Sequence, residues 1–86
     1  MTKNEIKMAE MEVKAGWQTA LHFQELAKTS GLIDQYKKAK HAAARARGMT
    51  HMAYIILQET AGVDEATDIV ESWVREVEKE EGAVLE

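Results

Sequence analysis

Apolar residues recur at spacings of three and four along almost the whole chain, and this pattern restricts the fold more than any other feature of the sequence. It divides into three segments, residues 4–29, 34–59 and 64–80, separated only by short breaks that contain Gly31 and Gly62. The chain contains no proline, and no segment shows the strict alternation of a half-buried strand. We therefore expect an all-α protein with three helices.

The two breaks predict how the helices are joined. Gly31 and Gly62 are placed to end the first two helices in the left-handed cap conformation. Asp34 and Asp64 are suited to begin the next two helices as N-cap residues. Connections this short favour antiparallel neighbours. The sequence thus predicts a three-helix antiparallel bundle, a long helical hairpin plus a shorter third helix, in a single helical domain over residues 1–84.

The expected core combines tryptophan with alanine. Trp17 and Trp73 lie on the main apolar stripes of the first and third helices and are expected to anchor the core. The facing side of the second helix is rich in alanine, which lets helix axes approach closely. Its second half is also apolar on the other side, so we expect burial nearly all round, with Met52 and Ile56 beneath the third helix. The pattern leaves open whether the second helix continues through Gly48.

Length and composition limit the class of protein. A chain of 86 residues buries only roughly 60% of its unfolded surface, and without cysteine it has neither a disulfide nor a thiolate zinc site. Oligomerisation is a natural supplement to such a core. No apolar run is long enough for a membrane span, and the N-terminus lacks a secretory signal, so we expect a cytoplasmic protein. Leu85 and Glu86 resemble a vector scar and are set apart from the fold.

A second, weaker apolar stripe lies on the first helix, roughly opposite the main one. It comprises Met8, Met11, Ala15 and Leu26. An apolar strip of this length without a partner is unusual on a monomer. These residues are therefore predicted to form the interface of a homo-oligomer, with a dimer as the first expectation. The alternative is that Met8 and Met11 lie on a frayed N-terminal turn.

The net charge of −4 is distributed unevenly along the chain. Residues 35–58 carry five Lys and Arg and no acid, whereas residues 59–86 carry two basic and ten acidic side chains. In one interpretation the acidic third helix neutralises the second, within the molecule or across a symmetric dimer, and its acidic end lies near Lys38 and Arg45. Exposed charge pairs of this kind contribute little stability.

In the other interpretation the basic side chains contact a partner. The candidate contacts are Lys37, Lys38, His41, Arg45 and Arg47. Such cations suit a phosphate ligand, a nucleotide or a nucleic acid. The chain is acidic overall, however, and nucleic-acid binders carry a net basic domain. A protein partner is therefore a stronger expectation than nucleic acid.

No residue pattern indicates catalysis, a cofactor or a metal. His41 and His51 are ten residues apart, which separates them around a helix, and neither Ser30 nor Ser72 has a glycine-rich elbow. We therefore expect a small non-enzymatic helical interaction protein, an adaptor or an inhibitor. It would self-associate and dock on a macromolecular partner through its charge-segregated surface. The alternative is a binding module for a phosphate ligand, nucleotide or nucleic acid that uses the basic second helix.

Overall fold

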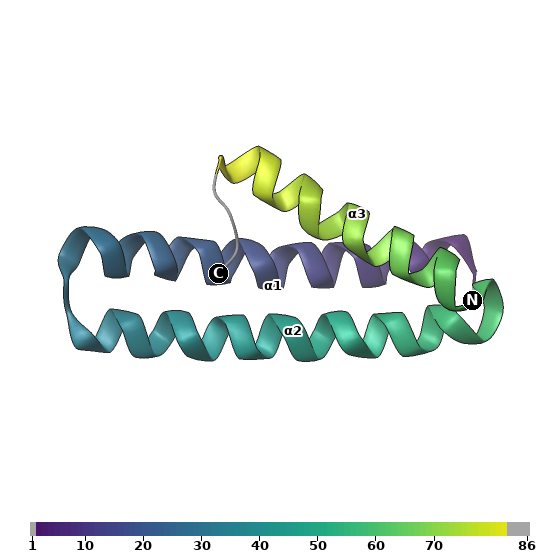
Figure 1. Ribbon diagram of the computed structural model, residues 1–86, viewed down its shortest axis with the longest axis horizontal. Helices are drawn as coiled ribbons and strands as arrows, with labels where there is room; N and C mark the ends of the chain where they lie inside the picture. Colours follow the sequence, from purple (N-terminus) through teal and green to yellow (C-terminus); the bar gives the residue numbers. More distant parts are fainter. Residues whose placement is uncertain (1, 83–86) are drawn as a thin grey trace.

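The computed structural model describes residues 2–82 and consists of three helices (Figure 1). Helix α1 spans Lys3–Ser30, α2 spans Ile33–Ala61 and α3 spans Val63–Glu81. No strand occurs among the described residues. The prediction of an all-α chain with three helices is confirmed. The predicted vector scar at Leu85 and Glu86, and the last two residues of the predicted domain, lie outside the described residues.

Helix α1 has well-formed caps at both ends. Thr2 and Glu5 form a capping box, in which the Glu5 backbone N–H donates to Thr2 Oγ1 at 3.2 Å. Gly31 ends the helix at φ 67° and ψ 8°, and its N–H donates to the carbonyl oxygen of Ala27 at 3.0 Å. This left-handed cap confirms the prediction for Gly31.

The predicted N-caps of the other two helices are wrong. Helix α2 already begins at Ile33 and α3 at Val63, so Asp34 and Asp64 lie in the first turn and do not cap it. No side chain caps either helix. The two carboxylates still lie at the positive end of a helix dipole, where negative charge is favoured.

Gly62 alone joins α2 to α3, and it does not adopt the left-handed cap conformation that the sequence predicted for it. Its φ of 87° and ψ of 166° lie in a region that is essentially restricted to glycine and differs from the left-handed cap. Its N–H donates to the carbonyl oxygen of Gln58 at 3.1 Å, while its own carbonyl accepts from Ala66 in the first turn of α3. One residue thus ends one helix and begins the next.

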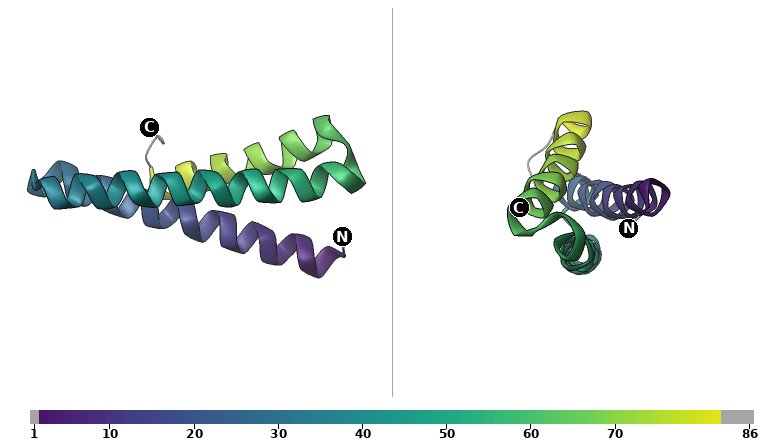
Figure 2. Two further views of the ribbon diagram at one scale, coloured as in Figure 1. Left: turned by 90° about the horizontal axis from the view of Figure 1, so that it is seen from below. Right: turned by 90° about the vertical axis from the view of Figure 1, so that its right-hand side faces the viewer.

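Helices α1 and α2 form an antiparallel hairpin, in which they lie close together at the Gly31 end and separate toward the Gly62 end (Figures 1 and 2). Helix α2 runs without a break through Gly48. Helix α3 starts at the Gly62 end of this hairpin and turns away from α2 along its length, so that its far end lies beside the middle of α1 (Figure 1). Viewed end-on, the three helices occupy the corners of a triangle (Figure 2). The half of the hairpin nearest Gly31 is therefore left without α3.

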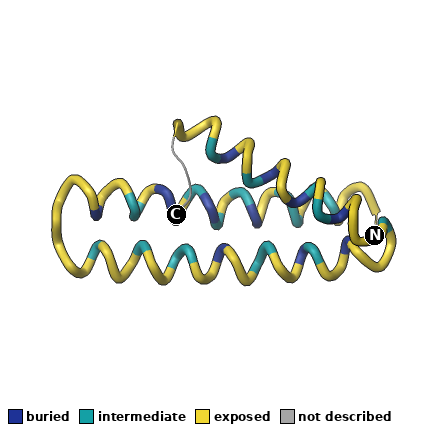
Figure 3. Tube along the Cα trace, viewed as in Figure 1, coloured by how far each residue is buried: buried dark blue, intermediate teal, exposed yellow. Residues whose placement is uncertain are grey.

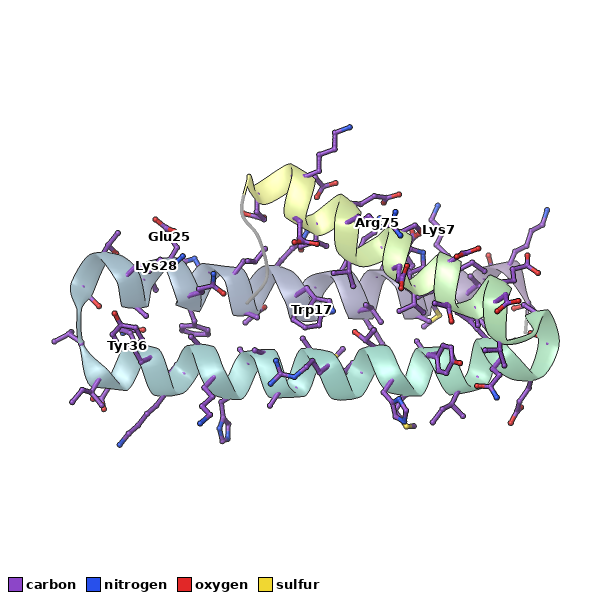
Figure 4. All side chains as sticks on the ribbon, viewed as in Figure 1. Lys7, Trp17, Glu25, Lys28, Tyr36 and Arg75 are labelled. Atoms are coloured by element: carbon purple, nitrogen blue, oxygen red, sulfur yellow. The ribbon has the colours of Figure 1, made fainter. Side chains whose placement is uncertain are left out.

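The core lies where the three helices meet. Trp17 projects from α1 toward α2, where its Nε1–H donates to Thr50 Oγ1 at 2.8 Å (Figure 4). The Thr50 hydroxyl donates in turn to the carbonyl oxygen of Ala46 at 2.7 Å. Trp17 and Trp73 are both buried, as the sequence predicted. The buried residues of α2 are two alanines and Leu57, so the hairpin closes on small side chains.

The expected burial of the second half of α2 is wrong. Met52 is 61% exposed and Ile56 is 42% exposed, whereas only the alanine-rich side of α2 is buried (Figure 3). The cause is the direction of α3. Because α3 turns toward α1, its buried residues Val70, Trp73 and Val77 join the same cluster as the core of α1, and they do not cover the outer side of α2.

Candidate helix-docking groove

A long groove follows the side of the hairpin that α3 does not cover. It consists of two adjoining hollows of about 510 Å³ and 520 Å³, and both are lined by residues of α1 and α2 alone. The two hollows share Glu12, Arg45 and Met49, so they form one continuous depression, which we call the hairpin groove. Its α1 wall contains Ala9, Glu12, Val13, Ala15, Gly16, Thr19 and Phe23, and its α2 wall contains Lys38, His41, Ala42, Arg45, Gly48, Met49, Met52, Ala53 and Ile56.

The floor of the hairpin groove is formed by small residues. A Cβ built on Gly16 would lie 3.4 Å from the Met49 sulfur and 3.5 Å from Cβ of Ala46. The absence of a side chain at Gly16 therefore lets α1 and α2 approach each other closely at this point. Close helix axes leave a shallow open depression above them, in place of a filled core.

The α2 wall changes character along its length. Near the Gly31 end it presents Lys38, His41 and Arg45, and toward the Gly62 end it presents Met52 and Ile56. Lys38, Arg45 and Met52 follow one another at intervals of seven residues, which places them in one line along the helix. The groove is therefore basic in one half and apolar in the other.

The five predicted basic contacts do not form a single surface. Lys38, His41 and Arg45 line the hairpin groove. Arg47 lies on another side of α2, where it borders two different hollows, and Lys37 lines none of those described. Because Arg47 follows Arg45 by two residues, the helical period alone separates them by more than half a turn.

Within one chain, the expected approach of the acidic third helix to Lys38 and Arg45 is wrong, because α3 turns away from α2 along its length (Figure 1). Neutralisation across a symmetric dimer stays a prediction. Glu76 of α3 pairs instead with Lys14 of α1, and Arg75 pairs with Glu71 on its own helix at 3.0 Å. The pair between Glu76 and Lys14 therefore ties α3 to α1 and not to the basic side chains of α2. The hydrogen bond from Lys14 to Glu76, together with the charge of Glu10, raises the pKa of Lys14.

The predicted oligomer stripe is exposed on the single chain. Met8 is 62% exposed and Met11 is 63% exposed, and Ala15 and Leu26 are also exposed. Ala15 lines the hairpin groove, and Met8 and Leu26 recur seven and eleven residues from it, on the same side of α1. Met8 and Met11 lie beyond the first turn of α1, which begins at Lys3, so a frayed first turn does not account for them.

Sequence analysis missed the apolar half of the groove. The sequence predicts Met52 and Ile56 in the core, because an apolar residue in a small helical protein is most often buried. The sequence nevertheless contains a sign of their exposure. Both residues lie off the alanine-rich stripe that includes Ala46 and Ala53, and a short third helix cannot cover every side of a long hairpin.

Two of the three histidines pack against the aromatic ring of a neighbouring residue. His22 meets Phe23 edge-on with ring centroids 5.7 Å apart, and His51 stacks on Tyr54 at 6.5 Å. Within residues 2–82, no group of three or more His, Cys, Asp or Glu side chains is placed to hold a metal ion. None of the described helices is both long and apolar enough to cross a bilayer.

Comparison of the chain with protein-family models, with curated protein sequences and with solved structures gives no match.

Proposed function

We propose that this protein is a small non-enzymatic interaction protein that self-associates through the hairpin groove, and that acts as an adaptor or an inhibitor for another macromolecule. The observation that supports the proposal is the exposed apolar wall of Met52 and Ile56 beside the open hollow. A groove between two helices is a common receptor for a further helix, whose side chains enter it at intervals of three and four residues. A cytoplasmic location remains part of this proposal.

The charges of the groove specify the helix that would fit it. The occupant needs apolar residues opposite Met52 and Ile56, and an acidic or polar segment opposite Lys38 and Arg45. Complementary charge of this kind raises the association rate and rejects wrong partners more than it increases affinity. The exposed acidic side chains of α3 lie outside the groove and would remain available to a further partner.

The phosphate-binding alternative has weaker support in the geometry. The candidate cations lie on different sides of α2, and the carboxylate of Glu12 lines the same hollow as Lys38 and Arg45. A carboxylate at that position would repel a phosphate. If the alternative holds, the affinity for an oligonucleotide falls steeply with salt, by about one counterion for each phosphate contact. It should also be lost in a Lys38→Glu, Arg45→Glu variant that still self-associates.

A single charge in the apolar half of the groove tests the proposed function. We expect Met52→Glu to abolish self-association, because the new carboxylate would be buried without a partner. Ile33→Glu is the matched control, since Ile33 is 71% exposed, lies outside the groove and already begins a helix. Size-exclusion chromatography with light scattering reports the mass of each variant. If Met52→Glu and Ile33→Glu behave alike, the groove is not the interface.

A further inference from the structure

We infer that the occupant of the hairpin groove is the same groove of a second copy, packed face to face with each helix antiparallel to its own counterpart. Helix α2 then lies on α2, and α1 on α1, around a two-fold axis that crosses the hairpin at the level of Gly48. This inference rests on the proposed function and adds to it the identity of the partner and the register.

The first observation is Gly48 itself. Apart from proline, glycine is the least favourable residue in a helix interior, and Gly48 lies in the middle of α2. Apart from its chain neighbours and its own helix backbone, no atom of residues 2–82 lies within 4 Å of a Cβ built on it, so no contact among these residues accounts for the missing side chain. A helix from outside that crosses α2 at Gly48 would account for it, because glycine permits close approach of another backbone.

The second observation is the level of the other mid-helix glycine. Gly16 contacts Met49, the residue next to Gly48, so both glycines lie at the same height along the hairpin. Gly16, Gly48 and the neighbouring Ala15 all line the groove. One two-fold axis can therefore pass α1 near Gly16 and α2 near Gly48, where neither helix carries a side chain.

The third observation is the charge pattern, which chooses between two symmetric arrangements. An axis parallel to the helices would place α1 of each copy on α2 of the other and the Gly31 ends of both copies together, so that two sets of Lys38 and Arg45 gather at one end of the interface. Like charges placed close together across an interface cost several kcal/mol. An axis perpendicular to the helices places the basic half of each copy against the apolar half of the other, and this repulsion is avoided.

The perpendicular axis also provides a partner for each basic residue. Lys38 lies ten residues before Gly48, and Glu59 lies eleven residues after it, on the same seven-residue line as Arg45 and Met52. Lys38 of one copy thus faces Glu59 of the other. Arg45 lies opposite Met52, where its aliphatic stem covers apolar surface while its charge reaches solvent.

The dimensions of the molecule agree with such a dimer. The molecule extends 44 by 21 by 21 Å, and the α1–α2 hairpin runs along its longest dimension (Figure 1). A standard stable interface buries roughly 800 Å² of each partner, so such a dimer would use most of the length of the hairpin. The interface would also enclose the exposed apolar residues of both helices, including Met8 and Ile56.

Disulfide trapping tests the register, because the chain has no cysteine of its own. Ala15 lies next to the axis, so Ala15→Cys should form an intermolecular disulfide in most of the protein under mild oxidation. Leu26→Cys is the matched control. It lies on the same side of α1 but about ten residues from the axis, so its two copies are much farther apart than the roughly 7 Å that a disulfide allows.

Three outcomes are distinguishable when the mass of each reduced variant is measured in parallel. A dimer in which Ala15→Cys cross-links and Leu26→Cys does not supports the inference. A dimer in which Ala15→Cys fails to cross-link, or in which Leu26→Cys does so equally, overturns the register and leaves the proposed self-association in place. A reduced monomer for both variants and for the unmodified chain overturns the inference together with the proposed function.

Discussion

Both sides of the α1–α2 hairpin carry apolar side chains, but those side chains are buried on one side and exposed on the other. On one side Trp73 of α3 is buried with Trp17 of α1 in a single cluster. On the other side Met52 and Ile56 face solvent beside an open groove. The difference shows that α3 completes only half of the bundle. The covered side holds the chain together, and the open side is where we place its interaction with other molecules.

The largest effect should come from removing the residue that holds α3 to the hairpin. We expect Trp73→Ala to lower the free energy of unfolding by about 3–5 kcal/mol, because a large buried side chain is lost and a cavity remains. Denaturant unfolding followed by circular dichroism measures this change. Ile56→Ala serves as the control from the open side and should cost less than about 1 kcal/mol in the dilute single chain. Equal losses at the two positions would contradict the contrast between the sides.

The next effect separates the stability of the chain from its self-association. Gly48→Ala should stabilise the dilute chain by up to about 1 kcal/mol, since alanine is the better helix former and its Cβ meets open space. Gly48→Leu should weaken the dimer at least tenfold, because the larger side chain keeps the two α2 helices apart. Thermal unfolding at low concentration and sedimentation at several concentrations report the two quantities. If the Gly48→Leu variant dimerises normally, the two α2 helices do not cross at Gly48.

A smaller effect is expected within the covered side. Thr50→Val keeps the shape of the side chain but removes the acceptor for Trp17 Nε1–H, which donates to the Thr50 hydroxyl at 2.8 Å. The half-buried donor then lacks a partner, and we expect a loss of about 1–2 kcal/mol in unfolding free energy. Thr19→Val is the matched control, because the exposed Thr19 hydroxyl donates only to a carbonyl within α1. A Thr50→Val variant as stable as this control would show that the Trp17 contact adds nothing.

The smallest effect on stability is expected from the ion pair between Lys14 of α1 and Glu76 of α3. Lys14→Met or Glu76→Gln should cost less than about 1 kcal/mol, since the pair lies near the surface. The pKa of Lys14 is raised in the folded chain, so the stabilisation is present at neutral pH and is lost only as the pH rises through that raised pKa in the alkaline range. Unfolding measured at neutral and alkaline pH should show the unmodified chain approaching the Lys14→Met variant at high pH. A difference in unfolding free energy that stays the same at both pH values would show that the Lys14–Glu76 pair does not provide the stabilisation.

The sequence was sufficient to predict those elements that depend on local patterns. Three helices, the left-handed cap at Gly31 and the burial of Trp17 and Trp73 all follow from spacing and from the preferences of single residues. The N-caps of α2 and α3 lie at Leu32 and Gly62, two residues before the predicted Asp34 and Asp64, because the apolar pattern does not show how few residues separate consecutive helices.

The open groove was beyond what periodicity can predict. An apolar stripe on α2 has the same appearance whether α3 covers it or not, and the direction of α3 depends on packing among residues distant in sequence. The same limit applies to the charges. The acidic composition of α3 predicted a partner on α2, whereas the crossing of the helices brings Glu76 to Lys14 of α1. The predicted oligomer stripe needed only the period of α1, and its residues are exposed as that prediction requires.

The central claim is that the open side of the hairpin is an interface, and sedimentation equilibrium of the unmodified chain tests it most directly. We expect the mass to approach twice that of one chain as the concentration rises through the micromolar range, and the association to be lost in Met52→Glu. A mass that stays at one chain over that whole range would contradict the account, because Met52 and Ile56 would then face only solvent.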